Sequence, residues 1–338
     1  MGLMSLFSAE AGARKVYCIE GSQIASAAEE VIRRNGKSSV VTVIRGRIEE
    51  AVIPEGKVDV IISEWMGYFL HYEDMVPAIL TFRDKYLSND GGLMFPSHAR
   101  MWASLYSDAK WYDARIRYWE DVYGFDYTPL ISKVVEEQFM NPERQHLRDI
   151  GVVSEPNLLH SIDMYTATLD DVKDIRAIID SKVTRNATIH GIAFWFDVLL
   201  EGDEHRVLLD TSPKAGYTSW SQVVWYVRDA FNVTRGQDVK GSFAMLRTER
   251  GEFDVAVRLI SPSRVELEAF DQSPSTMFQN LYERLSFEHG IYEGDKGRFD
   301  WKKTGNGLVD IASRLQLGFI AAGVSAFAVG WMVGRCNY

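Results

Sequence analysis

The first 95 residues alternate between short apolar runs and helical stretches. Residues 15–20 form an apolar run that ends in an acid, and residues 23–34 carry a helical pattern that an Asn-Gly pair closes. Two further runs, 40–44 and 58–63, are rich in β-branched residues. Strands that alternate with helices predict a parallel sheet whose binding sites lie at the carboxyl ends of its strands. The acids at or just beyond these ends, expected to line one crevice, are Glu20, Glu49 and Glu64.

After Phe95 and Pro96 the pattern changes to repeated strand-like runs separated by turns. Many short strands of this kind predict an antiparallel sandwich or barrel as a second unit. A helical insertion at 111–125 is rich in large aromatic residues, which favours an interface, with a local core cluster as the alternative. The strand-like runs cover 99–107, 189–200, 206–211, 221–228, 239–246, 253–260 and 264–270.

Residues 315–334 contain no charged side chain and lie between Arg314 and Arg335. A helix of this length matches the hydrocarbon thickness of a bilayer, and small residues recur in it at every fourth position. The segment therefore predicts a membrane-anchoring helix, with a buried helix outside any membrane as the alternative. The basic residues on its N-terminal side place the larger part of the chain in the cytosol, tethered to an intracellular membrane. The alternative location is the cytoplasm or nucleus without a tether.

Charge and composition narrow the classes of partner. The 47 acidic and 37 basic side chains give a net charge of −10, which disfavours direct nucleic-acid binding and favours a basic peptide. With 46% apolar residues the chain has enough material for a large core. Cys18 and Cys336 are too few for a disulfide framework or a cysteine zinc site, and no metal is expected.

Candidate chemistry is concentrated in residues 63–75 (SEWMGYFLHYEDM), where Glu64 and Glu73 stand on either side of a loop at Gly67. This loop leaves a predicted strand and enters a predicted helix near Glu73, so the two carboxylates can close on one pocket. Two carboxylates can grip the planar fork of a guanidinium group bidentately. Unrelated surface acids, or a carboxylate pair for glycoside hydrolysis, are the alternatives.

The same segment resembles the double-glutamate loop of the protein arginine methyltransferases, and similarity extends from residue 2 to about residue 272. Residues 2–13 resemble the helix that follows the family's glycine-rich cofactor loop. Residues 16–22 resemble the strand whose acid holds the ribose of S-adenosylmethionine, and residues 45–50 resemble the adenine-contact segment. Residues 111–126 resemble the dimerisation arm, and residues 211–220 resemble the Thr-His-Trp loop.

The resemblance implies methyl transfer from S-adenosylmethionine to arginine nitrogens of proteins, of the type that yields asymmetric dimethylarginine. Glu64 and Glu73 would hold the substrate guanidinium. The cofactor would contact Gly2, Glu20, Ile48 and Glu49, and the pocket that sets product specificity would include Met66, Met75, Ser219 and Trp220. Ordinary core packing is the alternative role for the two methionines. Expected partners are Gly/Arg-rich RNA-binding proteins, histone tails, and a second subunit that is identical or paralogous.

The implied fold is a truncated Rossmann-like class I methyltransferase domain followed by a β-barrel domain with a helical dimerisation arm and an apolar C-terminal helix. The expected divisions are a cofactor domain at 1–96, a barrel domain at 97–272 with its arm at about 108–145, a connector at 273–314, and the apolar helix at 315–334.

Three departures from the family pattern bear on activity. The chain starts at what would be the last glycine of the cofactor loop, so the first strand and the rest of that loop are not expected. The family's N-terminal helices are missing as well, and Ser219 stands where the family has His. Without the preorganised loop, the chain as given is expected to bind S-adenosylmethionine poorly. An incomplete N-terminus is one explanation; a catalytically inactive subunit that dimerises with and activates an active methyltransferase is the other.

Overall fold

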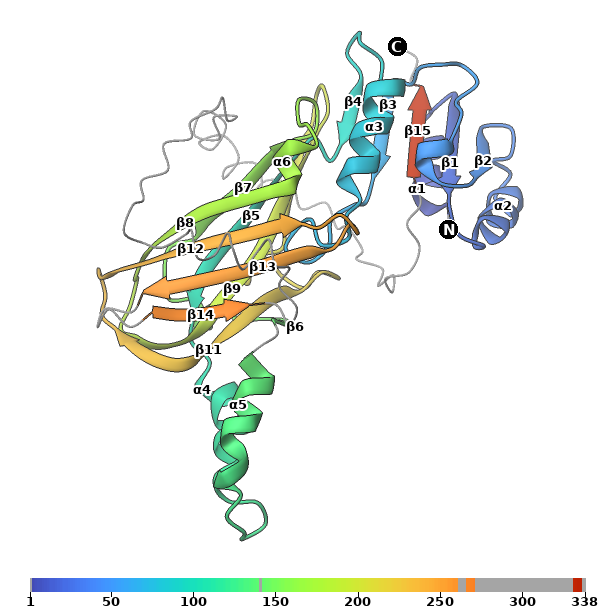
Figure 1. The fold of residues 1–338 in the computed structure, drawn as a ribbon. Coiled ribbons are helices and arrows are strands. Elements are labelled where there is room, and N and C mark those ends of the chain that lie inside the picture. The colour runs from blue at the N-terminus through green and yellow to red at the C-terminus, as the bar shows by residue number, and fades with distance from the viewer. Residues whose placement is uncertain (1, 140–141, 261–265, 271–330, 336–338) are drawn as a thin grey trace.

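The computed structural model describes residues 2–139, 142–260, 266–270 and 331–335, which form an α/β part and a larger β part (Figure 1). The sheet of the α/β part has the strand order β2-β1-β15-β3-β4. Its strands are β1 (Lys15–Glu20), β2 (Val41–Arg45), β3 (Val60–Ser63), β4 (Leu93–Phe95) and β15 (Trp331–Arg335). The helices of this part are α1 (Leu3–Glu10), α2 (Ala25–Arg34), the short turn η1 (Ile48–Glu50) and α3 (Val76–Tyr86).

The predicted parallel pairing is confirmed for β1 with β2 and for β3 with β4. The position between these two pairs, which the sequence leaves without a parallel strand, is taken by β15. This strand runs antiparallel to both neighbours, so that residue 331 lies opposite Ile19 on one side and Ser63 on the other. The backbone groups along the inner edges of β1 and β3 therefore find partners.

The predicted apolar helix is wrong for residues 331–334, because they are extended and paired within β15. The rest of that segment, residues 315–330, lies outside the described residues, as does the predicted connector. Among the residues that the structure describes, no helix is long and apolar enough to cross a membrane.

The β part is built from two antiparallel sheets that share one hydrophobic core. One has the order β6-β11-β9-β5-β7 with β10 paired to β9, and the other has the order β14-β13-β12-β8. The strands are β5 (His98–Tyr106), β6 (Glu143–Gln145), β7 (Asn157–Asp163), β8 (Asp174–Lys182), β9 (Ala187–Glu201), β10 (Arg206–Asp210), β11 (Gln222–Val233), β12 (Asp238–Arg247), β13 (Phe253–Ile260) and β14 (Glu266–Phe270). Two short helical elements, η4 (Asp149–Gly151) and α6 (Asp170–Lys173), connect strands.

All seven predicted strand runs of this part are present, but the predicted barrel is not closed by hydrogen bonds among the described residues. β7 and β8 lie side by side, as do β11 and β14, without forming a continuous ladder. The two sheets meet at these seams through side-chain packing, which needs no matching of backbone register.

The aromatic insertion forms an arm that projects from the β part (Figure 1). It contains α4 (Ala109–Arg115), η2 (Arg117–Glu120), η3 (Thr128–Leu130) and α5 (Ile131–Phe139). At its base Trp111 stacks on Tyr226 with ring centroids 3.5 Å apart, in a local core cluster. Further out, Tyr123 is 92% exposed and Phe125 is 69% exposed. The core-cluster alternative is therefore confirmed for the base of the insertion, and an interface at its exposed outer part stays a prediction.

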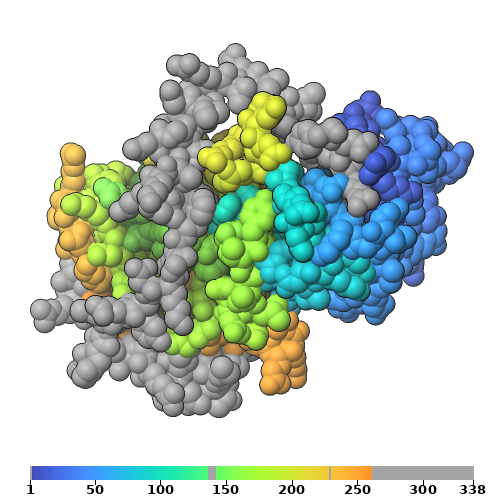
Figure 2. Space-filling view, turned by 90° about the horizontal axis from the view of Figure 1, so that it is seen from above, coloured from blue at the N-terminus to red at the C-terminus, as the bar shows by residue number. Residues whose placement is uncertain are grey.

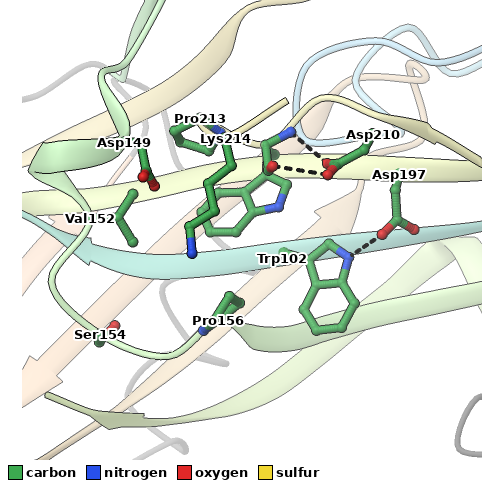
Figure 3. Close-up of a pocket in the computed structure, with 11 residues that line it drawn as sticks. Trp102, Asp149, Val152, Ser154, Pro156, Asp197, Asp210, Pro213 and Lys214 are labelled. Atoms are coloured by element: carbon green, nitrogen blue, oxygen red, sulfur yellow. Dashed lines mark hydrogen bonds between the residues drawn. The ribbon is translucent and has the colours of Figure 1, made fainter. Parts of the chain in front are cut away.

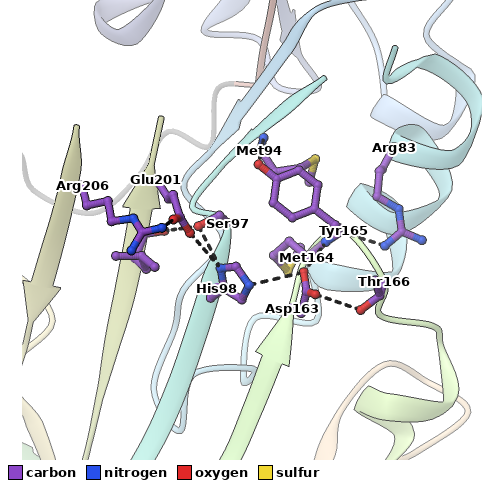
Figure 4. Close-up of polar contacts among 11 residues, drawn as sticks. Arg83, Met94, Ser97, His98, Asp163, Met164, Tyr165, Thr166, Glu201 and Arg206 are labelled. Carbon is purple, nitrogen blue, oxygen red and sulfur yellow. Dashed lines mark hydrogen bonds and ion pairs between the residues drawn. The ribbon is translucent and has the colours of Figure 1, made fainter. Parts of the chain in front are cut away.

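The two parts are joined by direct packing and by a set of polar contacts at the start of β5 (Figures 2 and 4). The Met94 amide donates to the Tyr165 hydroxyl at 3.2 Å, and Arg83 Nη1 donates to the Met164 carbonyl at 2.8 Å. The nearby His98 ring is buried, with Nε2 3.6 Å from Asp163 Oδ1. The contacts of Met94 and Arg83 join β4 and α3 of the α/β part to the residues that follow β7. Because β4 pairs with β3, they also fix the position of β3 relative to the β part.

Candidate active site

The double-glutamate loop begins where β3 ends and has an unusual backbone. Phe69, Leu70 and Asp74 all adopt left-handed φ angles, of 49°, 63° and 52°. Non-glycine residues in this region each cost of order 1–3 kcal/mol, and such residues cluster at functional sites. A hydrogen bond of 3.0 Å from the Gly67 amide to the Leu70 carbonyl closes the loop. The helix α3 starts at Val76, three residues after the predicted start near Glu73.

The loop brings Glu64 and Glu73 near enough for the charge of Glu73 to act on Glu64. Burial and, next, the charge of Glu73 raise the pKa of Glu64 to about 7, although hydrogen bonds from the Met66 amide and the Trp220 indole act in the opposite direction. Burial also raises the pKa of Glu73. Two neighbouring carboxylates whose pKa values are both raised are stabilised in the ionised form by a bound cation, so this loop suits a cationic ligand.

Gly67 sets the position of Glu73 by close approach. A Cβ at position 67 would lie 2.6 Å from the Glu73 Cγ and 3.2 Å from its amide nitrogen, which is closer than atoms can pack. The absence of a side chain at Gly67 is therefore what lets Glu73 fold back over the loop.

Of the residues expected to shape the pocket, Met66 and Trp220 are in contact with the double-glutamate loop around Glu64. Trp220 Nε1 donates to the Met66 carbonyl at 2.8 Å, which ties the loop after β10 to the double-glutamate loop. Met66 is buried, and Met75 packs against the main core from the residue that caps α3. Ser219 is exposed, and its hydroxyl makes no hydrogen bond to any residue within the described ranges.

Glu20 lies at the carboxyl end of β1 and has the features expected of a ribose ligand. The carboxylate is buried at 2% exposure, and its Oε1 accepts from the Ser22 amide at 3.0 Å and the Ser22 hydroxyl at 2.8 Å. Its Oε2 is buried without a hydrogen-bond partner in the described structure. A buried carboxylate oxygen in this state is costly unless a ligand supplies the donor, and a sugar hydroxyl would do so. The residues present therefore fit a nucleoside ligand at this edge.

The other residues expected to bind the cofactor occupy the same end of the sheet. Gly2 has a left-handed φ of 78° at the start of α1, where an added Cβ would lie 3.4 Å from Ile32 Cδ1 of α2. Ile48 is buried in η1, next to Glu49. Arg47 Nη2 lies 2.8 Å from Glu49 Oε1 and lowers the pKa of that carboxyl, so this acid already has a cationic partner.

Some residues of the site could not be found from sequence, because their pairing depends on the fold. Asp74 directly follows Glu73 and pairs with Arg247 from the end of β12. Arg144 of β6 donates to the Tyr68 hydroxyl and lies 5.2 Å from the centre of its ring. In the sequence, Arg144 and Arg247 are single charged residues far from the double-glutamate loop.

A separate pocket of about 220 Å³ lies on the outer face of the sheet that holds β5 and β9 (Figure 3). Trp102 and Trp195 line it from opposite positions on these two strands, and Lys214 extends across it. Its buried acid, Asp197, is neutralised by Arg100 through two hydrogen bonds of 2.7 Å and by the Trp102 indole at 3.0 Å. None of the residues predicted to act in catalysis lines this pocket, so it is not the candidate active site.

Comparison with known proteins agrees with this geometry. Residues 97–260 match the arginine methyltransferase oligomerization subdomain. The chain is 36% identical over 258 residues to "Probable protein arginine N-methyltransferase 1.2" of Arabidopsis thaliana, covering 76% of this chain and 69% of the relative. It is 35% identical over 257 residues to "Protein arginine N-methyltransferase 8-B" of Danio rerio, covering 75% and 59%. The fold resembles the solved "Trypanosoma brucei PRMT1 enzyme-prozyme heterotetrameric complex with AdoHcy", with a TM-score of 0.71, 28% identity, and coverage of 80% of this chain and 86% of that chain.

A Rossmann-like methyltransferase sheet, followed by a β part with a projecting arm and a double-glutamate loop between them, defines a class of two-part transferases. The chain belongs to the protein arginine N-methyltransferase family. It spans 69% and 59% of the lengths of the two curated relatives.

Proposed function

We propose that the chain transfers methyl groups from S-adenosylmethionine to the guanidinium nitrogens of arginine residues in proteins. The observation that carries this proposal is the pair of neighbouring carboxylates with raised pKa values, Glu64 and Glu73, on a strained loop at the carboxyl end of β3. Family membership supports the same reaction, and the relative from Trypanosoma brucei was solved with AdoHcy. Retention of both Glu64 and Glu73 favours an active enzyme over an inactive partner subunit.

The cofactor would lie across the carboxyl ends of β1 and β2. The unpartnered Oε2 of Glu20 would accept from a ribose hydroxyl, and the buried Ile48 would pack on the adenine ring. When bound, S-adenosylmethionine supplies an electrophilic methyl group on its sulfonium. The residues of this chain then have to place the nucleophile in line with that methyl group and exclude water.

Glu64 and Glu73 would place the nucleophile by holding the guanidinium group. In the free site, Glu64 is half protonated near pH 7 because of burial and the charge of Glu73. A guanidinium between the two acids would lower the pKa of both, so that both carboxylates are ionised in the complex. Their charges would draw the positive charge of the guanidinium to the nitrogens that they grip, which leaves the remaining nitrogen richer in electrons and better able to attack.

The surroundings of the acids support a dimethylating pocket of the asymmetric type. Met66 and Met75 stand at the positions that crowd the pocket in this family, and Trp220 holds the Met66 carbonyl in place at 2.8 Å. Two flexible but bulky side chains on one side would leave room for a second methyl group only on the nitrogen that already carries one. Ser219 is too short and too exposed to orient either acid.

The partners that fit this site are basic. The net charge of −10 favours Gly/Arg-rich proteins and histone tails as substrates. The exposed aromatic tip of the arm, with Tyr123 and Phe125, would dock on a second subunit, identical or paralogous. In this proposal residues 1–96 bind the cofactor, and residues 97–272 bind substrate and carry the arm.

The test is methyl transfer by the full chain to a Gly/Arg-rich peptide, with a peptide in which Lys replaces each Arg as the control. The expected product is asymmetric dimethylarginine, identified by mass spectrometry, and Glu64→Gln should abolish it. If the chain transfers no methyl group but stimulates a paralogous methyltransferase, and Glu64→Gln leaves that stimulation unchanged, the proposal is wrong and the inactive-partner alternative is right.

A further inference from the structure

The residue next to Glu73 makes an ion pair with the β part that the reaction does not itself require. Arg247 Nε donates to Asp74 Oδ1 at 2.5 Å, and Arg247 Nη2 donates to Asp74 Oδ2 at 2.6 Å. The side chains are only 25% and 19% exposed. Two parallel hydrogen bonds between a guanidinium and a carboxylate fix orientation as well as distance.

Both ends of this pair are held by backbone that has little freedom. Asp74 sits at a left-handed φ of 52°, a conformation that its loop has to maintain against local strain. Arg247 lies opposite the buried Phe253, where β12 turns into β13. The turn is closed by bonds from the Thr248 amide to the Glu252 carbonyl at 2.7 Å and from the Gly251 amide to the Thr248 carbonyl at 3.1 Å.

Gly251 extends the same contact surface. It has a left-handed φ of 79°, and a Cβ at this position would collide with Asp74 Oδ2. The turn between β12 and β13 therefore packs against Asp74 through the backbone of Gly251, while Arg247 forms hydrogen bonds with the same carboxylate. The neighbouring carboxylate in turn raises the pKa of Arg247, so the cation is permanent.

We propose that Arg247 is a positioning residue, which acts through Asp74 to hold Glu73 in place for arginine recognition. The role of Arg247 in catalysis rests on the proposed function. Arg247 lies 173 residues along the chain from Asp74, which it positions. Asp74 is in peptide linkage with Glu73, so a shift of the clamped carboxylate moves the Glu73 backbone with it. A misplacement of about 1 Å at a gripping group costs up to roughly a hundredfold in rate.

The experiment compares Arg247→Met, Asp74→Asn and the double variant with the unmodified full chain. In Asp74→Asn the charge is removed, but Asn tolerates the left-handed backbone as Asp does. Arg247→Lys tests whether a cation without the planar guanidinium group can restore the function. Lys240→Met is the matched control, because Lys240 lies at the other end of β12 and makes an exposed ion pair of 2.5 Å with Asp180. The three readouts are hydrogen exchange of the loop amides, kcat and KM for a Gly/Arg-rich peptide, and affinity for S-adenosylhomocysteine.

We expect each single variant to speed hydrogen exchange at residues 67–74 about tenfold and to lower kcat/KM about tenfold, with unchanged affinity for S-adenosylhomocysteine. The double variant should be no worse than the singles, since both remove one interaction, and Arg247→Lys should recover part of the loss. Lys240→Met should change nothing in the loop. Loop exchange and kinetics in Arg247→Met equal to those of Lys240→Met would overturn the inference. Absence of methyl transfer by the unmodified chain would overturn the proposed function instead, and the exchange data would then decide alone whether Arg247 holds the loop.

Discussion

The raised pKa of Glu64 makes a prediction about stability as well as about activity. Burial and the Glu73 charge raise this pKa from 4.5 to about 7 in the folded chain. Between these two values the folded chain holds a proton at Glu64 that the unfolded chain has lost, so the free energy of unfolding falls as the pH rises. Above pH 7 the whole penalty is present, and below pH 4.5 it is absent.

The size of the penalty follows from the same two values. At 1.36 kcal/mol per pKa unit, the rise from 4.5 to about 7 corresponds to about 3 kcal/mol. Glu64→Gln removes the charge and keeps an oxygen that can accept the hydrogen bond of 3.2 Å from the Met66 amide. We therefore expect this variant to be up to about 3 kcal/mol more stable than the unmodified chain at pH 8.5, and equally stable at pH 4, while it loses methyl transfer.

The assay is urea unfolding of both proteins, without substrate, at a series of pH values. Glu49→Gln is the control with the opposite sign: Arg47 lowers the pKa of Glu49, so its removal should be felt at high pH as a loss of stability rather than a gain. A constant difference between Glu64→Gln and the unmodified chain across the pH range would refute the reasoning, because it would show that the ionisation of Glu64 carries no cost in the folded state.

Three further predictions concern separate parts of the site. Gly67→Ala should push Glu73 away from its position, since the new Cβ would start 2.6 Å from the Glu73 Cγ; kcat/KM for an arginine peptide should fall tenfold or more, and full activity would contradict the proposed packing. Glu20→Gln should weaken the binding of S-adenosylhomocysteine by about tenfold in calorimetry, because one charge-assisted hydrogen bond is lost; an unchanged Kd would place the ribose elsewhere. Replacing Tyr123 and Phe125 by Ser should shift the sedimentation of the full chain toward the monomer, and an unchanged distribution would exclude the arm tip from the subunit contact.

Much of the backbone and the central acids were within reach of sequence reasoning. The run 15–20 is strand β1 at the predicted bounds, and its terminal acid is the buried Glu20. Glu64 and Glu73 were expected to close on one pocket, and the effect of the Glu73 charge on the pKa of Glu64 agrees with their being neighbours. These features were predictable because apolar periodicity and turn residues act locally, and because a short loop restricts the positions that its two acids can take.

Other parts of the fold and site were missed for two reasons. Polar residues obscure the hydrophobic pattern of some strands, and the partners of some charged residues lie far away in the sequence. Strand β8 (Asp174–Lys182) buries alternate residues, but charged side chains on its outer face mask the period. Strand β7 (Asn157–Asp163) has few apolar residues and no regular alternation. No local signal connects Asp74 to Arg247, since an ion pair across 173 residues exists only once both parts have folded. The strand at 331–335 was read as the end of an apolar helix because its residues suit either state, and the open sheet edges decided between them.

The left-handed Phe69 has a consequence for attempts to exchange parts between family members. Its ring leaves the double-glutamate loop and enters the core of the β part, 5.0 Å from Phe194 and 6.4 Å from both Trp225 and Phe243. The loop therefore contributes a side chain to an aromatic cluster whose other members come from strands β9, β11 and β12. A chimera that joins the α/β part of one relative to the β part of another would have to match the shape of this ring to its new surroundings. Otherwise the loop would shift, and Glu64 and Glu73 would be displaced even without a bound peptide. Modularity in this architecture is thus limited by a buried aromatic residue of the loop.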